Sequence, residues 1–123
     1  MAEIDGPIVH IIDDDAAVRE SLEALLTVLG YSVETYGSAE AYLERSEVND
    51  GCVLLDVHMP GMNGLDLLRE LARRRRRSPV LILTASRDER LRDHSLELGA
   101  VAFLTKPVTQ ARLLAALREA ISA

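Results

Sequence analysis

The segment that decides the fold is 51–64, GCVLLDVHMPGMNG, in which a short apolar run ends on an acid and the chain then turns. Residues 52–55 are apolar without the alternation of a half-exposed strand, which predicts a strand buried on both faces. Pro60 and Gly61 then favour a turn, because proline fixes φ and glycine allows positive φ. Asp56 is therefore expected at the carboxyl end of a central strand, where parallel sheets bind their ligands.

The bulk composition indicates one soluble globular domain over 1–123, with 48% hydrophobic and 28% charged residues. No apolar run reaches the roughly 18 residues of a membrane span, and the N-terminus is acidic where a secretory signal is basic. We therefore expect a cytoplasmic protein without a membrane partner. Cys52 is the only cysteine, which excludes an internal disulfide and predicts a small buried side chain.

The charge distribution argues against nucleic-acid binding by this domain. The net charge is −6, whereas binding to a phosphate backbone depends on basic surface. The arginine run 73–77 follows a helical segment, and cations are favoured at a helix C-terminus through the helix dipole. A solvated helix end therefore explains the run.

The rest of the chain alternates between apolar strands and helical segments. Strands are expected at 7–12, 31–36, 52–55, 80–83 and 101–104. Helix caps are expected at Asp15, Ser38, Asn63 and Thr109. Because parallel neighbours need crossover helices, this order predicts an α/β fold: a doubly wound, five-stranded parallel sheet of the flavodoxin-like order 2-1-3-4-5, with helices on both faces.

Two predicted helices differ in the strength of their apolar stripe. The first has an inward stripe that consists of Val18, Leu22, Leu25, Leu26 and Leu29. The helix 88–98 has the thinnest stripe of the chain, with Leu91, Leu96 and Leu98 as its anchors. Weak packing makes an element easier to shift, so we expect this helix to move most readily.

Polar residues follow four of the strands and are expected to meet at one edge of the sheet. They are Asp13, Asp14, Asp56, Thr84 and Lys106. Three carboxylates at close range repel one another, so the site requires a cation. With only oxygen ligands and no cysteine or histidine at ligand spacing, Mg²⁺ is the cation that fits.

Lys106 supports the same site from a different observation. It is the only lysine, whereas the other 13 basic residues are arginine. A compact ammonium pairs with a carboxylate and then with a phosphoryl oxygen more interchangeably than a planar guanidinium does. The alternative is a solvated loop lysine without a role.

Taken together, these residues resemble the response-regulator receiver domain of two-component signalling over 7–121. The motifs that carry the resemblance are Asp13 with Asp14, DVHMPGMNG at 56–64, Thr84 with Ala85, Phe103, and Lys106 with Pro107. The segments SAEAYL at 38–43 and GAVAFLTKPV at 99–108 further resemble the NarL/FixJ type of receiver.

The resemblance implies a role for each matching residue. Asp56 would be the phosphoacceptor. Mg²⁺ would be bound by Asp14, Asp56 and the backbone carbonyl of His58, with Asp13 acting mostly through water. The phosphoryl-binding and switch residues would be Thr84, Ala85, Lys106 and Phe103, and the Lys106–Pro107 bond would be cis.

The resemblance also implies partners. A sensor histidine kinase would supply the phosphoryl group, and the output would be transcriptional. Phosphorylation would favour a homodimer or a partner contact through the helix 88–98, the strand 101–104 and the last helix. His58 and Ser86 occupy positions associated with the dephosphorylation rate; His58 as a plain loop residue stays an equal alternative.

Two other functions compete with this interpretation. A phosphatase of the haloacid-dehalogenase type also uses an aspartyl phosphate, Mg²⁺, a threonine and a lysine, and Asp13 and Asp15 have its D-x-D spacing. However, the chain has no further acidic pair after Lys106 and no insert for a substrate. A pseudo-receiver that is never phosphorylated would not need all five site residues. We expect either a stand-alone receiver or part of a longer regulator.

Overall fold

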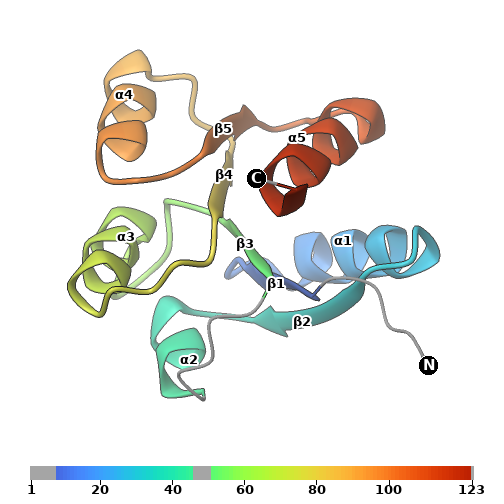
Figure 1. Cartoon of the computed structure of the whole chain (residues 1–123), viewed down its shortest axis with the longest axis horizontal. Helices are drawn as coiled ribbons and strands as arrows, with labels where there is room; N and C mark the ends of the chain where they lie inside the picture. Colours follow the sequence, from blue (N-terminus) through green and yellow to red (C-terminus); the bar gives the residue numbers. More distant parts are fainter. Residues whose placement is uncertain (1–7, 46–50, 123) are drawn as a thin grey trace.

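The computed structural model describes residues 8–45 and 51–122 and has a five-stranded parallel sheet in the predicted order β2-β1-β3-β4-β5 (Figure 1). Pro7, included in the first predicted strand, lies outside the described residues. The strands are β1 Ile8–Ile12, β2 Ser32–Tyr36, β3 Cys52–Leu55, β4 Val80–Thr84 and β5 Ala102–Thr105. The helices are α1 Ala16–Val28, α2 Ala39–Glu44, α3 Gly64–Arg73, α4 Glu89–Glu97 and α5 Gln110–Ser122.

The helices cover both faces of the sheet, with α1 and α5 on one side and α2, α3 and α4 on the other (Figure 1). Leu26 of α1 and Leu117 of α5 belong to one buried apolar cluster. Tyr42 of α2 and Leu67 of α3 belong to the other. All residues of β3 and β4 are buried, since both of their faces are covered. The continuous apolar runs therefore predicted the central strands correctly.

The predicted caps place the helix starts. Asp15 accepts hydrogen bonds from the amides of Ala17 and Val18, and Ser38 accepts one from Ala41. The Thr109 hydroxyl accepts one from the amide of Arg112. These side chains accept hydrogen bonds from backbone N–H groups that have no partner within the helix. They therefore define the residue at which each helix begins.

Two apolar residues predicted to face inward are exposed. Leu29 is 37% exposed and follows the last residue of α1, and Leu96 of α4 is 43% exposed. Instead Ser95 is the buried residue of α4, and its hydroxyl donates to the carbonyl of Leu91 at 2.7 Å. The prediction for Leu96 is wrong because successive side chains of a helix differ in direction by about 100°. When Ser95 faces the sheet, Leu96 next to it therefore points away.

The arginines of the run 73–77 make more contacts within the protein than the sequence indicated. Arg73 and Arg74 pair with Glu70 on the same helix. Arg76 is only partly exposed, and its guanidinium lies 5.9 Å from the centroid of the Tyr42 ring, a cation–π distance. The expectation of a wholly solvated helix end is therefore wrong for Arg76.

Candidate functional site

Three acids meet at the carboxyl edge of the sheet. Asp13 follows β1 and Asp56 follows β3, and the register pairs Ile12 with Leu55, so the two acids leave neighbouring strands side by side. Asp13, Asp14 and Asp56 each have an oxygen within 4.8 Å of the others. Asp14 is exposed, whereas the side chains of Asp13 and Asp56 are 5% and 11% exposed. The cluster therefore opens to solvent on the Asp14 side.

Lys106 bridges Asp13 and Asp56. Its Nζ lies 2.9 Å from Oδ2 of Asp13 and 3.6 Å from Oδ2 of Asp56. Burial lowers the pKa of Lys106, but its hydrogen bond to Asp13 and the charge of Asp56 outweigh the burial, and the net effect raises the pKa. The Lys106–Pro107 peptide bond is cis.

One ammonium faces three carboxylates, so the charge of the cluster is only partly compensated. Carboxylate oxygens that converge and remain open to water are the ligands of hard divalent cations, which keep several water molecules. The residues present therefore fit a divalent cation at this position. The amide of His58 donates to Oδ1 of Asp56 at 3.3 Å and its side chain is exposed; a role for its carbonyl stays a prediction.

Thr84 lies at the end of β4, close to the lysine. Its side chain is fully buried, and its carbonyl accepts a hydrogen bond from the amide of Lys106 at 2.7 Å. The amide of Ser86 lies 3.5 Å from the Thr84 hydroxyl, which makes a weak hydrogen bond. Ala85 is exposed, and Phe103 is half-buried against the cluster that contains α3. The end of β4 and the lysine loop are therefore joined by backbone contact.

The loop after Asp56 is shaped by glycine at two positions. The amide of Gly64 donates to the carbonyl of Val57, and a Cβ at Gly64 would lie 2.8 Å from the carbonyl oxygen of Asp56. Gly61 has φ +72°, a conformation that few other residues adopt. Asn63 and Asp66 then form a capping box that begins α3. The glycines within the loop and the capping box at its end thus define the conformation of the loop after Asp56.

Two residues outside the predicted set also hold the acidic loops. Arg19 of α1 donates from Nη1 to the carbonyl of Asp13 at 2.6 Å. Glu40 of α2 accepts from the amide of Met62 at 3.0 Å, and this hydrogen bond lowers the pKa of Glu40 below its usual range. No local pattern indicated Glu40, because its partner is 22 residues away.

Comparison with known proteins places this site in a family. Residues 9–118 match the family model of the response regulator receiver domain. The chain belongs to this family. Asp13, Asp14, Asp56 and Lys106, which carried part of the resemblance, meet at the carboxyl edge. The chain is a phosphoacceptor signalling domain, not a phosphatase of the haloacid-dehalogenase type.

Relatives agree over most of the chain. It is 44% identical over 114 residues to the transcriptional regulatory protein FixJ of Azorhizobium caulinodans, covering 92% of this chain and 54% of FixJ. It is 38% identical over 117 residues to the response regulator protein TodT of Pseudomonas putida, covering 93% of this chain and 51% of TodT. The chain thus spans about half the length of these relatives.

Solved structures show the same fold. The crystal structure of FixJ-N has a TM-score of 0.89 and 33% identity, with 97% of this chain and 96% of that chain covered. The crystal structure of full-length FixJ from B. japonicum has a TM-score of 0.86 and 38% identity, with 97% of this chain and 59% of that chain covered. In the part of the chain that the structure describes, no helix is long and apolar enough to cross a membrane.

Proposed function

We propose that the domain accepts a phosphoryl group on Asp56 from a sensor histidine kinase, with Mg²⁺ bound beside it. The observation that supports this most is the pairing of Lys106 with both Asp13 and Asp56 at the open edge of the sheet. A carboxylate that is reachable from solvent and flanked by an ammonium suits attack on a phosphorus atom. The family and the three converging acids agree with it.

The proposed phosphoryl transfer is an in-line displacement at phosphorus. A carboxylate oxygen of Asp56 forms the new P–O bond while the P–N bond of a phosphohistidine breaks, and the imidazole leaves with the electron pair. Lys106 then pairs with a phosphoryl oxygen in place of a carboxylate, and the buried Thr84 hydroxyl donates to another. Asp13, Asp14, Asp56 and the His58 carbonyl would hold Mg²⁺, which supplies charge neutralisation at the phosphoryl oxygens when bound.

The proposed output is a change in the face formed by α4, β5 and α5. Phe103 and Lys106 lie on β5 and directly after it, and Thr84 precedes α4, so a phosphoryl group that binds Thr84 and Lys106 would act on both borders of α4. That helix has only Ser95 buried among its residues. We propose that phosphorylation thereby favours a homodimer or a partner contact that controls transcription, since FixJ is a transcriptional regulatory protein.

Intact-mass analysis with acetyl phosphate tests the acceptor. We expect one added phosphate with Mg²⁺, none in excess EDTA and none for Asp56→Asn. Asp93→Asn, an exposed acid on α4, is the matched control and should be labelled like the unaltered protein. Equal labelling of Asp56→Asn would contradict the assignment. No labelling of the unaltered protein by acetyl phosphate or a phosphorylated kinase would favour a pseudo-receiver.

Hydrogen exchange with a beryllofluoride phosphate mimic tests the output face. Changed protection over 86–118, together with a larger hydrodynamic size, is the expected result, and Thr84→Ala should reduce both changes. Altered exchange confined to the loop after Asp56 would place the switch elsewhere. Unchanged mass in size-exclusion chromatography, with altered exchange over 86–118, would support a partner other than a second copy.

A further inference from the structure

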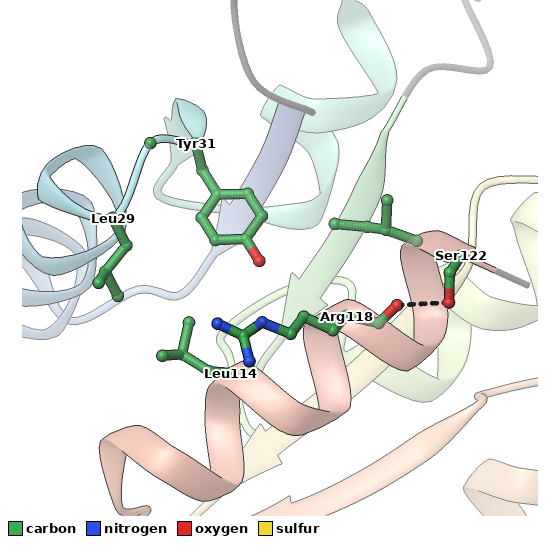
Figure 2. Close-up of a pocket in the computed structure, with 7 residues that line it drawn as sticks. Leu29, Tyr31, Leu114, Arg118 and Ser122 are labelled. Atoms are coloured by element: carbon green, nitrogen blue, oxygen red, sulfur yellow. Dashed lines mark hydrogen bonds between the residues drawn. The ribbon is translucent and has the colours of Figure 1, made fainter.

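A pocket lies between the end of α1 and the last turns of α5, away from the three acids (Figure 2). We call this pocket the hollow. Its volume is about 470 Å³, which lies within the range of about 300–1,000 Å³ typical of small-molecule sites. Leu29, Leu114 and Ile121 contribute apolar surface, and Tyr31 and Arg118 contribute polar groups. Because Tyr31 precedes β2, the hollow lies at the amino edge of the sheet, opposite the acidic site.

The two polar groups of this hollow point toward the same space. Figure 2 shows the Tyr31 hydroxyl directed toward the guanidinium of Arg118, which extends along α5 toward Leu114. Among the described residues, neither the Tyr31 hydroxyl nor the Arg118 guanidinium has a hydrogen bond or ion pair with another side chain. The hollow therefore offers a phenol donor and a cation next to apolar surface.

A helix-end effect does not explain this arrangement. Arg118 lies before the last turn of α5, and the helix dipole favours a cation mainly within that turn. The dipole does not account for the position of the guanidinium opposite Tyr31, nor for Leu29, which is 37% exposed next to both. In the part of the chain that the structure describes, the Arg118 guanidinium has no carboxylate partner, so it can donate to a bound anion.

We propose that this hollow binds a small amphipathic monocarboxylate with an aliphatic tail, such as octanoate. One carboxylate oxygen accepts from the Tyr31 hydroxyl and the other from the Arg118 guanidinium, as charge-assisted hydrogen bonds. The tail contacts Leu29, Leu114 and Ile121. A dianion such as phosphate fits less well, because the single guanidinium of Arg118 compensates only one charge. The site does not depend on phosphorylation of Asp56.

Titration with octanoate followed by amide chemical shifts of the ¹⁵N-labelled protein tests this site. We expect saturable shifts at residues 29–31 and 114–122. Octanol, which lacks the charge, and acetate, which lacks the tail, should each bind at least about tenfold more weakly, since each loses one part of the contact. Octanol binding as tightly as octanoate would overturn the proposal, as would shifts that do not saturate or that map elsewhere.

Variants test the two polar groups. Arg118→Met keeps the aliphatic length and should weaken octanoate binding about tenfold or more, and Tyr31→Phe about threefold. Arg112→Met is the matched control on the same helix, because Arg112 lines a different hollow. It should leave the affinity unchanged, and so should Asp56→Asn. Equal affinities for Arg118→Met and Arg112→Met would refute the assignment.

Discussion

The two sides of the acidic edge are packed very differently. On the side that carries Asp56, all of β3 is buried and α3 buries Gly64, Leu67, Leu68 and Leu71. On the side that carries Lys106, α4 buries only Ser95, and β5 buries only Leu104. Asp56 is thus held on a rigid support, whereas its lysine partner follows an edge strand with thin cover. Under the proposed function, a bound group that contacts both sides is therefore expected to move the second side more than the first.

Truncation of one leucine on each side should give the largest difference. Leu67→Ala of α3 should lower the free energy of unfolding by about 3 kcal/mol, because a fully buried side chain leaves a cavity. Leu91→Ala of α4 should cost about 1 kcal/mol, since that side chain is only partly buried. Urea denaturation measures both, with the exposed Leu96→Ala as the control within about 0.5 kcal/mol. Equal costs at Leu67 and Leu91 would remove the contrast.

Removal of one acid should stabilise the acceptor side in the absence of metal. Asp14→Ala relieves repulsion with Asp13 and Asp56 and should raise the free energy of unfolding by about 0.5–1 kcal/mol in EDTA. The same change should weaken Mg²⁺ binding, measured by thermal melts across a Mg²⁺ titration. Glu44→Ala, an exposed acid away from the cluster, should do neither. A lower melting temperature in EDTA with unchanged Mg²⁺ affinity would exclude the assigned role of Asp14.

Loss of the Glu40 contact should loosen the acceptor loop specifically. Glu40→Ala removes the acceptor for the Met62 amide, so exchange of that amide should accelerate and labelling by acetyl phosphate should slow about threefold. Glu40→Gln keeps an acceptor oxygen and should restore most of the rate, with Glu44→Ala again as the control. If Met62 exchanges at the same rate in Glu40→Ala, the loop is held by its glycine turns alone.

The smallest expected effect is a pH dependence at the end of α3. Hydrogen bonds from Arg73, and then from Arg74, lower the pKa of Glu70 to about 2. A lowered folded-state pKa stabilises the protein above the ordinary glutamate value of about 4.3, and this contribution disappears as the pH falls through about 2. The urea midpoint of the unaltered protein should therefore exceed that of Glu70→Gln slightly at pH 7 and converge with it near pH 2. A gap that persists at pH 2 would point to packing instead of charge.

The sequence by itself determined the sheet, its order and the gathering of the acids. Continuous apolar runs mark buried strands, and caps such as Asp15 and Asn63 mark helix starts, because both depend on neighbours a few residues away. Once the strands are parallel, Asp13 and Asp56 must leave the same edge. The place of Lys106 beside the acids also had a local signal, since it is the only lysine of the chain.

Tertiary structure alone decided which side chains meet across long separations. Lys106 was expected near the acids, but the structure shows that its closest hydrogen bond is to Asp13, 93 residues away. The contact of Glu40 with the Met62 amide, 22 residues away, had no sequence signal. The exposure of Leu96 likewise depends on how α4 is rotated about its axis against the sheet. The spacing of the apolar residues within α4 did not predict this rotation. Short-range patterns fix a helix or a strand, but the distance between two side chains depends on the crossings and rotations of whole elements, and these are set only when all the elements pack together.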